Sequence, residues 1–212
     1  MTLSAQDRAR RIKIILFDVD GVLTDGTIWV IPAPVAGPDG TITKMIEAKG
    51  FNSHDGAGVT LARLGGMKLG VITKRISEAV ALRARDLKLE FVYQGEAFKM
   101  RPVREIMAKE GVTLEEIAYV GDDVIDLAVM RECGLAIATA NAREQVKAEA
   151  HYVTTHRGGE GAGRDAIEFI LEAKGLLGQC LKASIDESNP LPPSIDIGKG
   201  GEDWPSRQPS RQ

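Results

Sequence analysis

Two acidic residues at the end of a short apolar run are the first candidates for chemistry in this sequence. Asp18 and Asp20 follow the apolar stretch 12–17, and the chain then turns at Gly21. A run rich in β-branched residues that ends at a carboxylate is typical of a buried parallel strand. Side chains two residues apart point to the same side of a strand, so the pair could bind one divalent cation. A solvated Asp-x-Asp turn is the alternative, and this stretch alone leaves both interpretations open.

Further polar groups follow later apolar runs. Thr73 ends the run 68–73, and Lys99 lies in the loop region after the run 90–93. A fourth run is followed by three acidic residues, Asp122, Asp123 and Asp126. In an open parallel sheet the carboxyl ends of all strands lie at one edge, so these groups can converge there with the first acidic pair.

Together these groups could hydrolyse a phosphate monoester. That reaction needs a nucleophile, a cation that offsets the phosphate charge, fixed donors for the phosphoryl oxygens, and an acid for the leaving alkoxide. Asp18 can form an aspartyl-phosphate, and Mg²⁺ can bridge Asp18, Asp122 and the phosphate. Thr73 and Lys99 can hold the phosphoryl oxygens, and Asp20 can protonate the leaving group.

The elements that must position these groups alternate along the chain. The expected strands are 12–17, 68–73, 90–93, 114–120, 135–138 and 152–154, and the expected helices are 58–64, 77–87, 99–110, 125–133, 144–150 and 164–177. Alternation at this spacing predicts an α/β fold, a doubly wound parallel sheet with right-handed crossovers.

One insertion and one tail depart from this alternation. Two β-prone runs around a Pro/Gly/Asp turn predict a β-hairpin at about 27–46, directly after the first strand. Its apolar residues need a partner surface, which could belong to another subunit. The sequence therefore predicts one domain over 1–177 that carries the hairpin as an insertion, and a disordered tail over 178–212, of which 184–212 is rich in Pro, Gly and Ser.

Composition narrows the class of protein. The 212 residues, 43% of them hydrophobic, can bury one substantial core. A net charge of -3 and an aromatic content of 5% predict no nucleic-acid partner. No apolar run reaches the roughly 18 residues that span a bilayer, and the polar N-terminal stretch lacks the apolar centre of a signal peptide, so we expect a cytoplasmic protein without a membrane partner. Cys133 and Cys180 have no metal or redox spacing and are expected to be reduced.

The four groups of polar residues, in their order and spacing, resemble the four motifs of the haloacid dehalogenase superfamily. Three further segments, 51–56 (Phe-Asn-x-x-Asp-Gly), 93–95 (Tyr-Gln-Gly) and 158–164 (Gly-Gly-x-Gly-Ala-x-Arg), resemble its capless sugar-acid phosphatases. The similarity covers roughly 12–177. It implies a Mg²⁺-dependent phosphatase of lipopolysaccharide biosynthesis that acts on a small phosphorylated sugar acid, most closely 3-deoxy-D-manno-octulosonate 8-phosphate. It also implies a homotetramer joined through the hairpin.

The resemblance also implies roles for individual residues. Asp18 and Asp122 would bind Mg²⁺ through their carboxylates, Asp20 would add its backbone carbonyl, and Asp123 and Asp126 would support these ligands. The substrate-binding residues would be Asn52, Ser53, His54, Asp55, Gly56, Arg75 and Arg83. Alternatively, both arginines could be ordinary charged residues that point from a helix into solvent.

Three departures from the family pattern bear on the substrate. His54 and Thr60 stand where basic residues are usual, and Lys74 stands where glycine is usual. Arginine binds a carboxylate with two parallel hydrogen bonds, so these changes leave a related nonulosonate or another sugar phosphate as alternative substrates. A non-catalytic oligomerisation domain of the same fold is the alternative from another class. The intact acidic residues and Lys99 argue against it.

Overall fold

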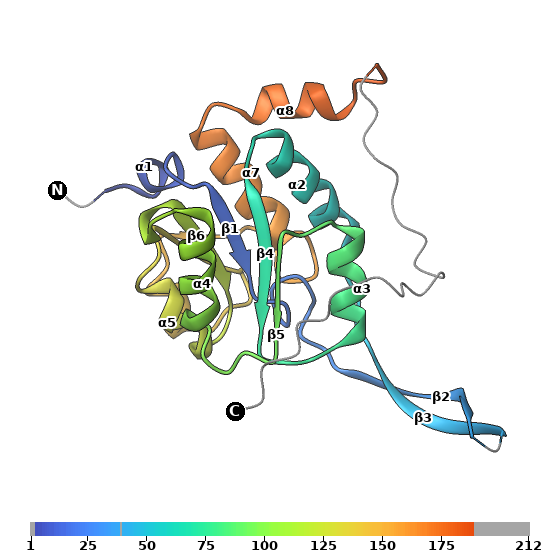
Figure 1. The fold of residues 1–212 in the computed structure, drawn as a ribbon. Coiled ribbons are helices and arrows are strands. Elements are labelled where there is room, and N and C mark those ends of the chain that lie inside the picture. The colour runs from blue at the N-terminus through green and yellow to red at the C-terminus, as the bar shows by residue number, and fades with distance from the viewer. Residues whose placement is uncertain (1–2, 39, 189–212) are drawn as a thin grey trace.

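The computed structural model describes residues 3–38 and 40–188, and its centre is a six-stranded parallel sheet (Figure 1). The strand order is β5-β4-β1-β6-β7-β8. The bounds are β1 Ile14–Phe17, β4 Lys68–Thr73, β5 Phe91–Gln94, β6 Ile117–Gly121, β7 Leu135–Ala138 and β8 Tyr152–Val153. Every residue of β1 is buried, because β1 pairs with β4 on one side and β6 on the other. The α/β fold expected from the alternating runs is confirmed.

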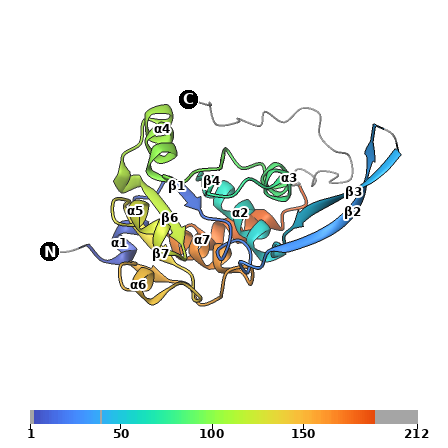
Figure 2. The ribbon, with the colours of Figure 1, turned by 90° about the horizontal axis from the view of Figure 1, so that it is seen from below.

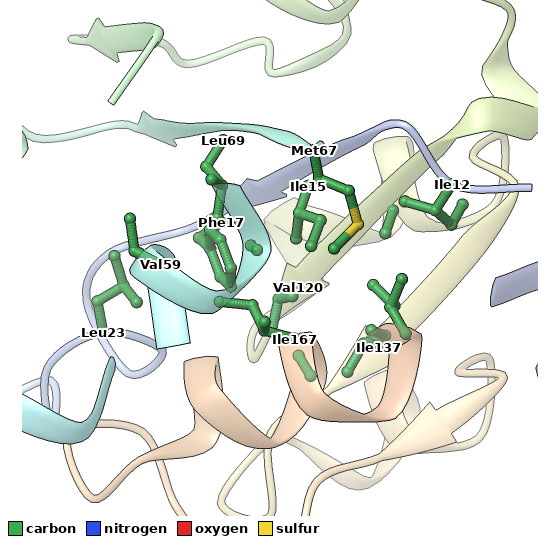
Figure 3. Packing of buried hydrophobic residues seen from close by; sticks show 14 of the residues in the cluster. Ile12, Ile15, Phe17, Leu23, Val59, Met67, Leu69, Val120, Ile137 and Ile167 are labelled. Carbon is green, nitrogen blue, oxygen red and sulfur yellow. The ribbon is translucent and has the colours of Figure 1, made fainter. Parts of the chain in front are cut away.

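Helices cover both faces of the sheet and enclose two cores. Ile15 and Phe17 of β1 point into the first core, and Ile14 and Leu16 point into the second. Figure 3 shows the first core, in which Phe17 packs among side chains of the neighbouring helices. That core takes residues from α1 (Ala5–Ala9), α2 (Ser53–Leu64), α3 (Glu78–Asp86), α7 (Ala162–Ala173) and α8 (Leu177–Ser184), and the second from α4 (Met100–Glu110), α5 (Leu127–Met130) and α6 (Glu144–Lys147).

Side-chain caps move several element boundaries away from those expected. Helix α2 begins at Ser53 rather than residue 58, because the Asn52 side chain accepts a hydrogen bond from the backbone N–H of His54 at 2.8 Å. Strand β6 begins at Ile117, because Thr113 and Glu116 cap a single 3₁₀ turn, Leu114–Glu116, ahead of it. The helix expected over 125–133 is a 3₁₀ turn, Val124–Asp126, followed by the short α5.

The boundary placed at residue 177 needs correction. Residues Leu177–Ser184 form helix α8, which packs against α2 and α7. Cys180 anchors it, since its side chain is 2% exposed and belongs to the first core. The folded unit therefore extends to the end of α8. This helix was not predicted because the polar residues after 184 made the whole segment resemble a disordered tail. Of the predicted disordered tail, 189–212 lies outside the described residues.

The insertion after β1 is the expected hairpin, with strands β2 (Trp29–Gly37) and β3 (Gly40–Ala48). Figures 1 and 2 show it leaving the body of the molecule as a two-stranded arm. Ile31 lies directly opposite Ile46, and both are exposed. Side chains two residues apart share a face of the ribbon, so one face carries Trp29, Ile31, Val35, Ile42 and Ile46, with Lys44 as its one charged residue.

The structure bears on the two cysteines and on membrane-spanning helices. Cys133 and Cys180 are free and buried. Among the described helices, none has the length and apolar character to cross a membrane.

Candidate active site

Asp18 stands at the carboxyl end of β1, in a nearly closed polar environment. Asp18 as a whole residue is 5% exposed. Oδ1 accepts a hydrogen bond from the backbone N–H of Val19 at 2.7 Å, and Oδ2 lies 2.9 Å from Nζ of Lys99. Burial raises the pKa of Asp18 to about 6, and the ammonium of Lys99 limits that rise. Asp18 is therefore a desolvated carboxylate that is ionised at neutral pH.

Lys99 joins two carboxylates from different strand ends. It lies directly before α4, is 2% exposed, and places Nζ 2.6 Å from Oδ1 of Asp126. A buried lysine is rare unless it is paired with carboxylates. The sequence predicts Lys99 as a donor for phosphoryl oxygens, and the structure places it beside Asp18.

Asp126 supports the loop that follows β6. Oδ1 accepts hydrogen bonds from Lys99 and from the hydroxyl of Tyr119 at 2.9 Å, and Oδ2 accepts them from the backbone N–H groups of Asp122 and Asp123 at 3.0 and 3.2 Å. All of these partners are donors, so both oxygens are already engaged. Asp126 thus holds the backbone of the two acidic residues in front of it.

The site fits a hard divalent cation. Carboxylate oxygens of Asp18, Asp122 and Asp126 lie within 4.8 Å of one another. Oδ1 of Asp122 is buried and has no hydrogen-bond partner among the described residues. Burial, and then the neighbouring carboxylates of Asp126, Asp18 and Asp123, raise the pKa of Asp122 to about 7. An oxygen-only donor set with excess negative charge suits Mg²⁺.

Gly21 permits the close approach of two loops. Its φ is +86°, a left-handed conformation that favours glycine, and a Cβ there would lie 2.1 Å from Oδ2 of Asp122. The Gly21 carbonyl in turn accepts a hydrogen bond from Nδ2 of Asn141 at 3.1 Å, and Oδ1 of Asn141 accepts one from the backbone N–H of Gly158 at 2.6 Å. The role of Asn141 was not predicted, because a single asparagine after a strand does not by itself indicate a site.

A pocket of about 560 Å³ opens in front of these groups. Its lining residues come from the ends of β1, β4 and β6 and are Asp18, Asp20, Thr73, Lys74, Arg75, Ile76, Asp122, Asp123 and Ile125. The structure therefore brings together the strand-end groups that the parallel topology required. Thr73 lies at the end of β4 and is 2% exposed.

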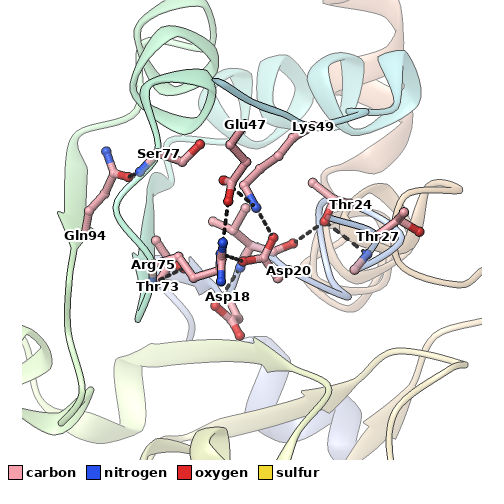
Figure 4. A network of polar contacts seen from close by, with 12 residues as sticks. Asp18, Asp20, Thr24, Thr27, Glu47, Lys49, Thr73, Arg75, Ser77 and Gln94 are labelled. Atoms are coloured by element: carbon pink, nitrogen blue, oxygen red, sulfur yellow. Dashed lines mark hydrogen bonds and ion pairs between the residues drawn. The ribbon is translucent and has the colours of Figure 1, made fainter. Parts of the chain in front are cut away.

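Asp20 belongs to a second network on the hairpin side of the pocket (Figure 4). Lys49 directly follows β3 and forms an ion pair with Asp20. Its Nζ also lies 3.2 Å from Oε1 of Glu47. Arg75 pairs with Glu47 and lies 3.8 Å from Asp20. The hydrogen bond from Arg75, helped by Lys49, lowers the pKa of Glu47 to about 2. Glu47 and Lys49 were missed because nothing in a β-strand sequence shows which charged residue folds back toward the site.

The remaining residues assigned to substrate lie outside the pocket lining of this chain. Asn52 caps α2 and donates to the carbonyl of Gly159 at 3.1 Å. Asp55 is 3% exposed and accepts a hydrogen bond from the backbone N–H of Arg164 at 3.0 Å. Arg83 pairs with Asp86 at 2.7 Å and donates to the carbonyl of Asn52.

The other three members of the assigned set, Ser53, His54 and Gly56, lie on the first turns of α2. Ser53 and His54 are exposed there, and Gly56 leaves room for the Arg83 guanidinium, which a Cβ would approach to 2.9 Å. Within one chain, Arg75 is thus the member of the set that lines the pocket.

Comparison with known proteins agrees with this geometry. Residues 72–163 match the haloacid dehalogenase-like hydrolase family. The 3-deoxy-D-manno-octulosonate 8-phosphate phosphatase of Escherichia coli (strain K12) is 35% identical over 178 residues, which is 84% of this chain and 89% of that protein.

Solved structures of such phosphatases share the fold. The Yersinia pestis enzyme aligns with a TM-score of 0.73 at 35% identity over 82% of this chain and 88% of its own. The Moraxella catarrhalis enzyme, solved in complex with a magnesium ion, a phosphate ion and KDO, aligns with a TM-score of 0.74 at 35% identity over 84% of this chain and 97% of its own. The resemblance drawn from the four motifs is confirmed, and the chain belongs to the haloacid dehalogenase-like hydrolase family.

Proposed function

We propose that this chain is a Mg²⁺-dependent phosphatase that hydrolyses 3-deoxy-D-manno-octulosonate 8-phosphate, a step of lipopolysaccharide biosynthesis. The observation that carries the proposal is that Asp18 lines one pocket with Asp20, Thr73 and Asp122 and also contacts the buried Lys99. A nucleophile, an acid and donors for phosphoryl oxygens thus lie around one volume.

Asp18 is proposed as the nucleophile. Its carboxylate oxygen attacks phosphorus, the bond from phosphorus to the sugar oxygen breaks, and that oxygen takes a proton from Asp20. Water then attacks the aspartyl-phosphate while Asp20 accepts a proton from it, which frees phosphate and restores Asp18. Lys99 and Thr73 hold the phosphoryl oxygens through both steps.

Asp18, Asp122 and the backbone carbonyl of Asp20 would hold Mg²⁺, and Asp126 and Asp123 would fix the Asp122 loop. The bound cation would offset the charge of the phosphate and of the clustered carboxylates. We expect EDTA to remove activity and Mg²⁺ to restore it. Recovery with Zn²⁺ but not with Mg²⁺ would contradict the assignment, because the donor set consists of oxygens.

The substrate class rests on the relatives and on the charge of the pocket. The Moraxella catarrhalis relative was solved with KDO, a sugar acid. In this chain Lys74 and Arg75 line the pocket and could bind a sugar carboxylate. We propose that Asn52, Ser53, His54, Asp55, Gly56 and Arg83 contribute to substrate binding only where subunits meet, since they lie outside the pocket of a single chain.

A panel of phosphorylated compounds tests the proposal. Phosphate release would be measured with the octulosonate 8-phosphate, a nonulosonate 9-phosphate, and neutral sugar phosphates such as glucose 6-phosphate. The proposal expects the highest kcat/KM for the octulosonate. Preference for a nonulosonate or a neutral sugar would reassign the substrate, and no turnover of any compound with Mg²⁺ present would favour the oligomerisation domain.

We also propose that the chain forms a homotetramer through its hairpin. The support is the exposed apolar face of the β2–β3 arm, which a single chain leaves uncovered. Closed symmetric assembly is the common way to bury such a face. The cytoplasmic location and the exclusion of nucleic-acid and membrane partners stay predictions from the sequence.

A further inference from the structure

Lys49 is an unusual residue of the hairpin, because its side chain is fully covered. The exposed fraction of the side chain is 0%, although the preceding strand β3 is largely exposed. Nζ pairs with Oδ1 of Asp20 and lies 3.2 Å from Oε1 of Glu47. A covered ammonium is retained only where carboxylates compensate its desolvation, so this position is built around the two acidic partners.

Arg75 approaches the same two carboxylates from the other side. One guanidinium nitrogen pairs with Glu47, and Nε lies 3.8 Å from Oδ2 of Asp20. The Arg75 side chain is 44% exposed, and it lines the pocket. Of the two cations, Lys49 is the enclosed one with the shorter contact to Asp20, so it fixes the orientation of that carboxylate more firmly.

We propose that Lys49 is a positioning residue for the general acid Asp20, an inference that rests on the proposed phosphatase function. The ammonium engages Oδ1, which leaves Oδ2 to hold the proton. When the phosphorus–oxygen bond to the sugar breaks and the bond to Asp18 forms, this proton passes from Oδ2 to the leaving oxygen. The base of the hairpin thereby orients a catalytic group, in addition to any part that the arm has in assembly.

A double-mutant cycle tests this coupling. Lys49→Met, Asp20→Asn and the double variant would be assayed with the octulosonate phosphate. Lys49→Met should lower kcat by about 10-fold or more with little change in KM, because acid catalysis is worth about 10² to 10⁴ fold. In the Asp20→Asn background the same change should have little further effect, since there is no acid left to position. Lys49→Arg, which keeps the charge, should recover part of the activity.

The leaving group supplies an independent readout. p-Nitrophenolate departs as a stable anion and needs little protonation. The rate of the first turnover, which ends at the aspartyl-phosphate, should therefore fall far less with p-nitrophenyl phosphate than with the sugar phosphate, in both Lys49→Met and Asp20→Asn. Lys182→Met is the control, because Lys182 is an exposed lysine of α8 that belongs to neither the arm nor the pocket lining. It should match the unmodified protein on both substrates.

The outcomes separate this inference from the proposed function. If the unmodified protein hydrolyses the sugar phosphate but Lys49→Met is additive with Asp20→Asn, Lys49 acts independently of the acid and the inference fails. An equal loss of the first-turnover rate on both substrates would likewise show a merely structural role. If the unmodified protein hydrolyses neither substrate, the proposed function itself fails. Should only the sugar phosphate be turned over, the mutant cycle decides.

Discussion

Nζ of Lys99 lies 2.6 Å from Oδ1 of Asp126, and both side chains are almost completely buried. The same ammonium lies 2.9 Å from Asp18, so one cation serves two carboxylates in a region of low dielectric. Removing one partner of a buried ion pair leaves the other charge uncompensated, which costs more than the pair itself contributes. Lys99 is therefore expected to support the folded state as well as the chemistry.

Lys99→Met should lower the free energy of unfolding by about 3–5 kcal/mol at neutral pH without added metal. The measurement is urea-induced unfolding, followed by circular dichroism. Lys13→Met is the control: Lys13 pairs with Glu116 at the surface, where its side chain is 61% exposed, and such a pair contributes about 1 kcal/mol or less. Similar losses in the two variants would mean that the buried lysine is not needed to balance the carboxylates.

Asp18→Asn should abolish turnover and leave the fold intact. An amide of the same shape fits the site, keeps an oxygen for the Val19 N–H, and carries no buried charge. It cannot act as the anionic nucleophile, and it would also weaken the binding of Mg²⁺. Phosphate release over long incubation measures the residual rate. Turnover near that of the unmodified protein would remove Asp18 from the mechanism.

The residues at the strand ends were predictable because they depend only on local composition and on the parallel topology of the sheet. The apolar composition of a buried strand such as β1 identifies it in the sequence. Parallel topology then places Asp18, Thr73 and Asp122 at one edge of the sheet. Lys99 was predictable from its place after a strand-end loop. The pairing of Lys99 with Asp126 inside the core was not, because it depends on how α4 and the loop after β6 pack together.

Residues that fold back on the site from elsewhere were not predictable. Glu47 lies in β3 and Lys49 directly follows it, whereas Lys44 of the same strand is exposed, and the sequence alone does not show which of these charged residues turns toward the site. Asp55 reads as part of a binding motif, yet in this chain it accepts a hydrogen bond from the backbone at the start of α7. Helix α8 was missed because one buried cysteine, Cys180, is a weak signal beside the polar residues that follow.

Asp55 should make stability depend on pH. Burial raises its pKa from 3.8 to about 6 in the folded protein. Between these values the folded state binds more protons than the unfolded state, so the stabilisation from Asp55 is complete below about pH 4 and is lost as the pH rises through about 6. A shift of about two pKa units corresponds to about 3 kcal/mol.

Asp55→Asn removes this titration. Its unfolding free energy, measured in urea at several pH values, should rise relative to that of the unmodified protein by up to about 3 kcal/mol between about pH 4 and pH 7. Groups that titrate in both proteins cancel in the difference. A difference that stays constant with pH would show that the Asp55 carboxyl is not desolvated in solution.

The hairpin offers a test of assembly that leaves the chemistry of each chain untouched. Ile31 and Ile46 face each other across β2 and β3, are 43% and 40% exposed in one chain, and lie on the apolar face of the arm. Lysines at these two positions remain in water in a lone chain, but they would bury like charges between arms that pack against each other.

If the proposed tetramer forms through the hairpin, Ile31→Lys combined with Ile46→Lys should dissociate it to monomers. The same variant should lower kcat/KM by about 10-fold or more, because misplaced or missing groups at a site commonly cost that much. Light scattering gives the oligomeric state, and the phosphate assay gives activity on the same samples. Ile185→Lys is the control, since Ile185 is an 80% exposed isoleucine at the end of α8, away from the arm. An unmodified protein that is a fully active monomer would show that the hairpin works within one chain, as a flap beside its own pocket.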